Sequence, residues 1–116
     1  MKPVNLAAKL AQFNTHWDPH VVADYNGNDV MVVKFLGEFP FHIHEETDDF
    51  FFVLEGEMVM DIEDRSCAVN EGELFVVPKG ATHRPRADAE CKVLLIEPKG
   101  VPNTGDPATA TSKPRI

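Results

Sequence analysis

The chain has 116 residues, which suits a single domain built around one hydrophobic core. Hydrophobic residues make up 43% of it and charged residues 26%, the proportions of an ordinary globular protein. A net charge of -8 argues against nucleic-acid binding through a basic surface, because phosphate contacts require clustered lysines and arginines.

The chain has no apolar stretch with the length of an export signal or a membrane span. Lys2 and Lys9 interrupt the short apolar runs near the amino terminus. The two cysteines, Cys67 and Cys91, make no disulfide framework and lie too far apart in the sequence for a zinc knuckle. We therefore expect a cytoplasmic protein with reduced thiols and no membrane partner.

A short helix is predicted near the amino terminus. Asn5 can cap it, and apolar residues at spacings of four and three form one helical face: Leu6, Leu10 and Phe13. We expect the helix over residues 6–13, with that face packed on a sheet. Residues 1–19 then comprise the N-terminal helix and its connection to the rest of the chain.

The middle of the chain is a series of short β-prone segments separated by Gly, Pro and Asn turns. Strands are predicted at 20–25, 29–36, 50–54, 57–63, 67–69, 74–77, 82–86 and 92–97. Many short strands with one helix indicate an all-β sandwich or barrel, which we expect to span residues 20–100. Met58 and Met60 share one face of the fourth of these strands, where they fill the core or line a cavity.

The last segment, residues 101–116, has scattered Pro, Gly and Thr and no periodic apolar pattern. Such a segment cannot form a core of its own. We expect an extended or disordered C-terminal tail, or one that lies on a partner subunit.

His42 and His44 are the first candidates for chemistry. Residues two apart on an extended segment share one face, so both imidazoles point the same way. Two neutral imidazoles side by side can bind a metal ion, and a structural role in the core is the alternative. A third histidine, His83, follows the strand at 74–77 and a Pro/Gly turn, and a hairpin-like return can place it opposite the pair.

These stretches resemble the two sequence motifs of the cupin family. The first motif is matched by Gly37, His42, His44, Asp49 and Gly56, and the second by Gly72, Pro78, Gly80, His83 and Ala87. The phrase DDFFFVLEGE is also similar to the DELFYVLEGE wording of small single-domain cupins. The resemblance spans residues 37–87 and implies a double-stranded β-helix, or jelly-roll, barrel. It also implies four metal ligands inside that barrel: His42, His44, Asp49 and His83.

Three positions depart from the family pattern. Gly37 stands five residues before His42, where the usual gap is one longer, and a β-bulge can absorb that difference. Asp49 stands where the family usually has Glu, so the carboxylate arm is one methylene shorter. Ala87 replaces the usual Asn, which removes a polar group but no ligand.

The choice of carboxylate depends on spacing. Counting back six residues from Gly56 selects Asp49, with Asp48 or Glu46 as alternatives. For the acidic residues other than Asp49, a solvated loop with no chemical task is the simpler interpretation.

The resemblance implies a small metal-binding cupin with one divalent transition metal. The donor set does not distinguish Fe, Mn, Ni, Cu and Zn. Four protein ligands on a six-coordinate ion leave two positions for substrate and either water or dioxygen. The implied activity is that of a metal-dependent dioxygenase, isomerase or decarboxylase acting on a small organic molecule. The family also implies a homodimer.

Two other functional classes stay open at this point. One is a non-catalytic small-ligand binding or sensing barrel, which the Asp49 and Ala87 departures favour. The other is a structural barrel in which His42 and His44 are hydrogen-bonded in the core.

Four further polar residues have weaker functional signals. Arg84 and Arg86 have opposite strand parity to His83, so they are either surface arginines that balance acidic loops or an anion contact at the barrel rim. His16 and His20 have no partner at ligand spacing and are expected to be structural or exposed.

Overall fold

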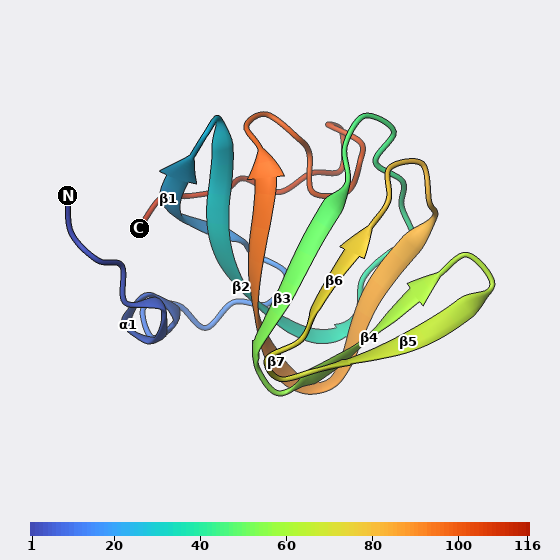
Figure 1. Cartoon of the computed structure of the whole chain (residues 1–116), viewed down its shortest axis with the longest axis horizontal. Helices are drawn as coiled ribbons and strands as arrows, with labels where there is room; N and C mark the ends of the chain where they lie inside the picture. Colours follow the sequence, from blue (N-terminus) through green and yellow to red (C-terminus); the bar gives the residue numbers. More distant parts are fainter.

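The structure, a computed structural model, describes all 116 residues. It contains one helix and seven strands (Figure 1): α1 (Leu6–Leu10), β1 (His20–Tyr25), β2 (Asn28–Glu38), β3 (Asp49–Glu55), β4 (Glu57–Ile62), β5 (Arg65–Asn70), β6 (Leu74–Val77) and β7 (His83–Pro98). The prediction of an all-β protein with a short N-terminal helix is confirmed. No helix has the length and apolar character needed to cross a membrane.

Every strand pair is antiparallel, and the main path through the sheet is β1-β2-β7-β3-β6. The β4–β5 hairpin joins this path through β7. The second half of β7 lies between β2 and β3, whereas its first half pairs with β4, from Ile62 opposite His83 to Val59 opposite Arg86. One long strand therefore connects the two sides of the barrel (Figure 1).

The strands predicted at 82–86 and 92–97 are parts of the single strand β7. The intervening residues, 87–91, contain no Gly or Pro that would end a strand. Instead, the register between β2 and β7 shifts between Phe35 and Gly37, which face Cys91 and Ala87. This irregularity lets β7 change direction without a break.

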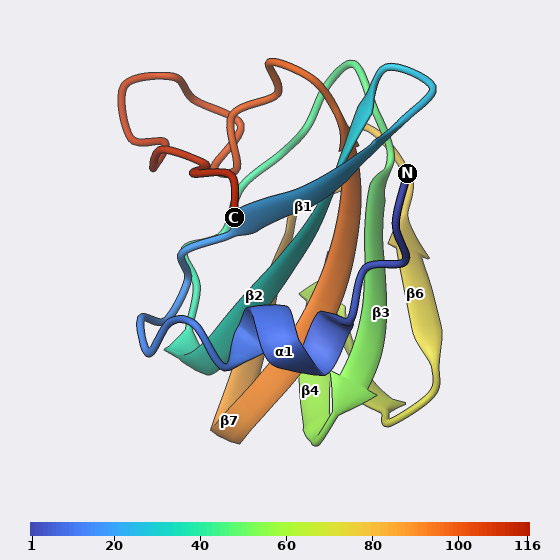
Figure 2. The ribbon, with the colours of Figure 1, turned by 90° about the vertical axis from the view of Figure 1, so that its left-hand side faces the viewer.

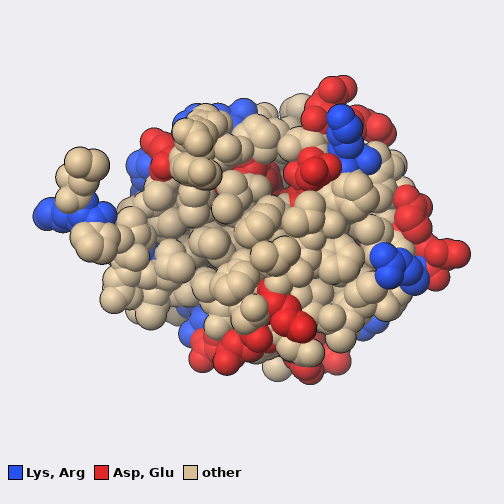
Figure 3. All heavy atoms as spheres, viewed as in Figure 1, with Lys and Arg blue, Asp and Glu red and all other residues tan.

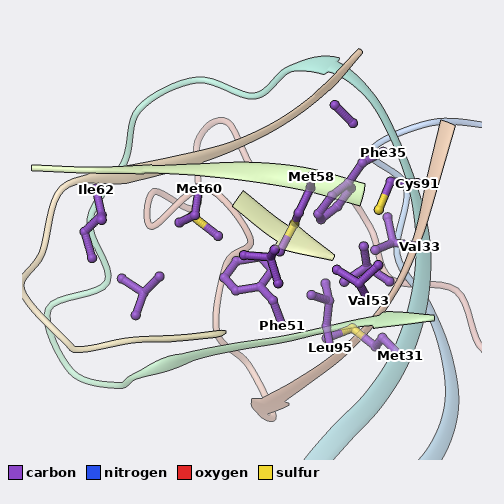
Figure 4. Close-up of a cluster of buried hydrophobic side chains, with 14 of the residues drawn as sticks. Met31, Val33, Phe35, Phe51, Val53, Met58, Met60, Ile62, Cys91 and Leu95 are labelled. Atoms are coloured by element: carbon purple, nitrogen blue, oxygen red, sulfur yellow. The ribbon is translucent and has the colours of Figure 1, made fainter. Parts of the chain in front are cut away.

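The main core lies between the two sides of the barrel and contains 16 buried residues. Figure 4 shows Met58 and Met60 pointing into this cluster beside Phe51 and Leu95. Both methionines are 1% exposed or less, so of the two roles expected for them, core filling is the one observed.

A second, smaller apolar cluster forms where α1 packs on the outer face of β2 (Figure 2). Leu10 and Phe13 are buried there against Val22 and Val32. The helix ends at Leu10 rather than at the predicted Phe13, but Phe13 still reaches the cluster from the connection.

The C-terminal segment, residues 101–116, has little regular secondary structure and returns along β1 of its own chain (Figure 2). The Val21 N–H donates to the Pro114 carbonyl at 2.8 Å, and the Ile116 N–H donates to the Val21 carbonyl at 3.0 Å. Arg115 also pairs with Asp24 at 2.6 Å. The last residues are therefore held to β1 by backbone and side-chain contacts.

Candidate metal centre

Three separate segments bring the predicted ligands together. His42 lies between β2 and β3 and forms an isolated antiparallel bridge with His83, the first residue of β7. His44 follows two residues after His42, and Asp49 is the first residue of β3. Asp49 pairs with Val77 of β6, so its position is fixed by the sheet.

The four side chains converge inside the barrel. One ligand atom from each lies within 4.8 Å of the others: His42, His44, Asp49 and His83. The imidazole centroid of His42 is 5.0 Å from that of His44 and 4.3 Å from that of His83. His44, Asp49 and His83 are buried, and His42 is half-buried. The structure thus brings together all four residues that the sequence selected.

Backbone carbonyls orient two of the imidazoles. His42 Nδ1 lies 2.9 Å from the Pro40 carbonyl oxygen, and His83 Nδ1 lies 2.9 Å from that of Ala81. A carbonyl oxygen only accepts hydrogen bonds, so each Nδ1 must carry the proton and donate it. In the neutral imidazole, Nε2 then has a free lone pair, which is the form that binds a metal ion.

The contact between His83 and Asp49 brings two ligand atoms close together. His83 Nε2 lies 3.1 Å from Asp49 Oδ2. Because Nδ1 of His83 already carries a proton, a neutral ring would place two acceptor atoms against each other. A metal ion bound by both atoms removes this conflict.

Two other buried atoms of the cluster have no hydrogen-bond partner: His44 Nε2 and Asp49 Oδ1. The 3.4 Å approach of His44 Nε2 to Asp49 Oδ2 is an electrostatic contact without hydrogen-bond geometry. Buried polar atoms are almost always paired, so unpaired ones need a reason. An ion bound by imidazole nitrogens and a carboxylate oxygen would supply their missing partner, and the residues present therefore fit a metal ion.

Burial and mutual charge set the protonation of the cluster. Burial lowers the pKa of His42 to about 4, and the nearby imidazoles of His83 and His44 act in the same direction. For His44, burial opposes the charged form, but pairing with the Asp49 carboxylate outweighs it and raises the pKa. For Asp49, burial is outweighed by pairing with His44 and His83, so its pKa is lowered. Asp49 is therefore an ionised, acceptor-only group at neutral pH.

A narrow cavity of about 30 Å³ adjoins the cluster. Its polar lining comes from His42, Asp49, Glu97 and Asn103. Its other walls are apolar and aromatic: Trp17, Pro19, Val33, Phe35, Phe39, Phe51, Pro85 and Leu95. Two of the candidate ligands, His42 and Asp49, therefore face a narrow space with mainly apolar walls.

Glu97 is a buried carboxylate near the cluster that the sequence analysis missed. It is 4% exposed and pairs with Lys113 of the C-terminal segment, with 3.1 Å between Oε2 and Nζ. Burial raises the pKa of Glu97, the Asp49 charge adds to this effect, and Lys113 opposes it. A signal was present in the sequence, because Glu97 has the same strand parity as the buried Val93 and Leu95.

The alternative acidic residues lie outside the cluster. Asp48 is exposed, and its Oδ1 accepts a hydrogen bond from the Lys79 N–H at 2.9 Å. Glu45 and Glu46 are exposed as well. The only carboxylate that meets the three imidazoles is that of Asp49.

The remaining polar residues form contacts away from the cluster. His16 pairs with Glu90 at 2.8 Å, and His20 stacks on Phe13 with 3.9 Å between ring centroids. Arg84 and Arg86 each donate to Asp61 Oδ2 at 2.9 Å. Both arginines thus balance acidic groups, as expected in the simpler of the two interpretations.

Comparison with protein families identifies the fold. Residues 30–97 match the family model described as the cupin domain. The chain belongs to the cupin family. This cupin is also similar to the solved structure of a cupin-2 domain containing protein from Shewanella frigidimarina NCIMB 400, with 41% identity and a TM-score of 0.81. The match covers 83% of this chain and 94% of the other, which confirms the predicted barrel.

Two relatives in sequence are an uncharacterized protein and a dioxygenase. The cupin is 34% identical over 79 residues to the uncharacterized protein YdbB of Bacillus subtilis, covering 67% of this chain and 70% of that one. It is 31% identical over 111 residues to the 3-hydroxyanthranilate 3,4-dioxygenase of Xanthomonas euvesicatoria, covering 90% of this chain. The match covers 63% of that dioxygenase, so this cupin spans less than two thirds of its length.

Proposed function

We propose that this cupin binds one divalent transition metal through His42, His44, Asp49 and His83 and acts with it on a small organic molecule. The observation that carries the proposal is the pair of buried atoms without partners, His44 Nε2 and Asp49 Oδ1, within a cluster whose ligand atoms lie within 4.8 Å of one another. Imidazole and carboxylate ligands suit Fe, Mn, Ni, Cu and Zn.

The reaction class that we propose is a metal-dependent oxygenation, with isomerisation as the second option. The relationship to a 3-hydroxyanthranilate 3,4-dioxygenase supports the first. A bound metal would supply a Lewis-acid or redox centre with open coordination positions. The chain itself contributes neutral imidazole at His42, negative charge at Asp49 and an apolar wall that limits water near the reacting molecule.

The proposal is tested by oxygen uptake with reconstituted protein. Metal-free protein would be loaded anaerobically with each of the five metals and mixed with a panel of small phenols, aminophenols and 3-hydroxyanthranilate. We expect oxygen uptake with at least one pair of metal and substrate, and none with His83→Ala loaded in the same way. Absence of uptake with every pair, in protein that holds a full equivalent of metal, would contradict the oxygenase proposal.

A non-catalytic role in small-ligand binding is the second candidate function. Two departures from the family pattern favour it: Asp49 stands in place of the usual Glu, and Ala87 in place of the usual Asn. Thermal stabilisation of the metal-free protein by a metabolite, without turnover, would favour this role. Stabilisation that depends on the bound metal and is followed by turnover would favour the enzyme.

We further propose that two copies of the chain pair through the outer face of the β7-β3-β6 layer. The register places Phe50 beside Val76 and Ile96, and Phe52 beside Leu74 and Leu94, on the face opposite the core. Leu74 is 56% exposed and Val76 is 45% exposed. Figure 3 shows uncharged atoms across the middle of this view, with charged groups mainly toward its margin. Helix α1 covers the neighbouring part of the sheet (Figure 2), where Leu94 packs against its cluster, and Leu74 and Val76 stay exposed.

A further inference from the structure

The C-terminal segment, residues 101–116, contributes one residue to the wall of the cavity beside the candidate ligands. Asn103 lines the cavity directly. The segment also contacts the site at Gly105, which packs on the connection between β2 and β3, and at Lys113, which pairs with Glu97 of β7. Except for the bridge at Arg115, the segment lies outside the sheet.

Gly105 lies directly against the backbone that carries two of the candidate ligands. A Cβ added at Gly105 would lie 2.1 Å from the carbonyl oxygen of Ile43, the residue between His42 and His44. The φ angle of Gly105 is +76°, a backbone conformation that residues other than glycine rarely adopt. No larger residue fits here, so the close approach of the segment to the histidine pair depends on this glycine.

Lys113 ties the far end of the segment to the interior. Its Nζ lies 3.1 Å from Glu97 Oε2 and also donates to the Val101 carbonyl, and the two side chains are 14% and 4% exposed. Breaking a buried ion pair leaves an unpaired charge away from water, which is strongly unfavourable. The pair therefore opposes release of the segment from the barrel.

The small volume of the cavity limits which molecules can enter it. A volume of about 30 Å³ has room for about two water molecules. The walls formed by β2, β3 and β7 are fixed by sheet hydrogen bonds, and their displacement would break the barrel. The C-terminal segment is held mainly by the contacts at Lys113, Gly105 and β1, so it is the wall whose movement costs least.

We propose that residues 101–116 are a closing wall, latched by Lys113 and seated by Gly105, that sets the size of molecule able to reach the metal ligands. The effect on access to a metal ion depends on the proposed metal site, whereas the position of the wall depends only on contacts within the chain. With the wall in place, the cavity beside His42 and Asp49 admits only molecules of a few heavy atoms. Larger ones enter when the Lys113–Glu97 pair opens.

The first test is the rate at which EDTA removes cobalt from the loaded protein. Removal by a bulky chelator proceeds through the open form, so its rate follows the population of that form. Lys113→Met removes the ion pair with Glu97, and Gly105→Val prevents the close approach to Ile43 without a change of charge. We expect both to accelerate removal by about tenfold or more. The matched control is Lys92→Met, which breaks another lysine–glutamate pair outside the C-terminal segment, with 2.7 Å between Lys92 Nζ and Glu55 Oε2. This control should change the rate of cobalt removal less than about twofold.

Two further readouts do not depend on a bound metal. The amides of Val21 and Ile116 bond across the segment and β1, so their hydrogen exchange reports whether the segment is docked. Trp17, the single tryptophan, lines the cavity, so its quenching by acrylamide reports access. Both rates should rise in Lys113→Met and Gly105→Val but not in Lys92→Met. If Lys113→Met folds poorly, Glu97→Gln/Lys113→Met removes both charges and takes its place.

The outcomes separate the wall from the metal site. Faster exchange at Val21 and Ile116 with unchanged cobalt removal and unchanged Trp17 quenching would overturn the wall, because the segment would then open without giving access. If the wild-type protein binds no cobalt, the proposed metal function fails, and quenching of Trp17 alone tests whether the segment controls access to the cavity. Increased quenching in the variants would support it, and equal quenching would overturn it.

Discussion

His42 and His83, which are 41 positions apart in the sequence, exchange two backbone hydrogen bonds of 3.0 Å each. Each residue donates its N–H to the carbonyl of the other, as in a regular antiparallel pair. The main chain thereby holds the two imidazoles with 4.3 Å between ring centroids before any ion binds. Such preorganisation reduces the conformational entropy that metal binding has to overcome.

Replacement of His83 by Ala should remove metal from the protein. His83 is 1% exposed and contributes one of the four ligand atoms, so its loss should weaken binding by about 100-fold or more. Metal content after dialysis, measured by elemental analysis, checks this. His20→Ala is the control, because His20 is also buried but stacks on Phe13 away from the cluster. Equal metal content in both variants would favour a structural role for His83.

Asp49→Asn should lower the pKa of His44 in the metal-free protein. Burial alone opposes the charged imidazole, and the pairing with Asp49 is what raises the pKa above its ordinary value. Without that negative charge, the imidazolium form should be populated only at lower pH than in the wild type. An NMR titration of the imidazole signals measures the shift. Asp48→Asn, at an exposed neighbour, should leave it unchanged, and an unchanged pKa in Asp49→Asn would contradict the assigned pairing.

Local signals predicted part of the fold. Alternation along strands and Gly/Pro turns indicated an all-β sandwich or barrel, with His42, His44 and His83 in or beside its strands. The jelly-roll arrangement and the convergence of these histidines with Asp49 were implied by the resemblance to the two cupin motifs, because no local signal brings together residues so far apart in the sequence.

The features that the sequence did not reveal depend on contacts distant along the chain. The pair of Glu97 with Lys113 forms only after the C-terminal segment folds back, and no local pattern marks Lys113. The continuity of β7 through residues 87–91 spans a register shift, from Ala87 opposite Gly37 to Cys91 opposite Phe35, which no local pattern marks. Strand parity was the one local signal for Glu97.

Asp61 should contribute to acid stability. Burial raises its pKa, but hydrogen bonds from Ser66, Arg86 and Arg84 outweigh this and lower the pKa to about 2 from 3.8. A carboxyl with a lowered folded-state pKa stabilises the fold above the unfolded value, and this contribution disappears as the pH falls from about 4 to about 2. Because the arginines are partly exposed, we expect about 1 kcal/mol at neutral pH.

Urea unfolding of Asp61→Asn at pH 7 and pH 3 measures this contribution. The variant should be less stable than the wild type at pH 7, and the difference should narrow at pH 3. Asp64→Asn, in the same hairpin but without an ion pair, serves as the control. A stability difference that is equal at both pH values would show that ionisation of Asp61 has no part in the effect.

Val76→Lys should dissociate the proposed dimer. Val76 lies on the edge strand β6 within the apolar patch, and a charged ammonium there cannot be buried without a partner. Light scattering after size-exclusion chromatography should give twice the 12.9 kDa chain mass for the wild type and a single chain mass for the variant. Leu36→Lys, at a residue 40% exposed outside the patch, should stay dimeric. A monomeric wild type at micromolar concentration would contradict the pairing.

The most direct measurement for the central claim is anomalous X-ray diffraction from crystals of protein loaded with one equivalent of metal. The account predicts a single strong peak between the three imidazoles and the carboxylate: His42, His44, His83 and Asp49. Bond lengths to nitrogen and oxygen should be about 2.0 to 2.2 Å. A peak elsewhere, for instance at the His16–Glu90 pair, or no peak in protein saturated with metal, would contradict the account.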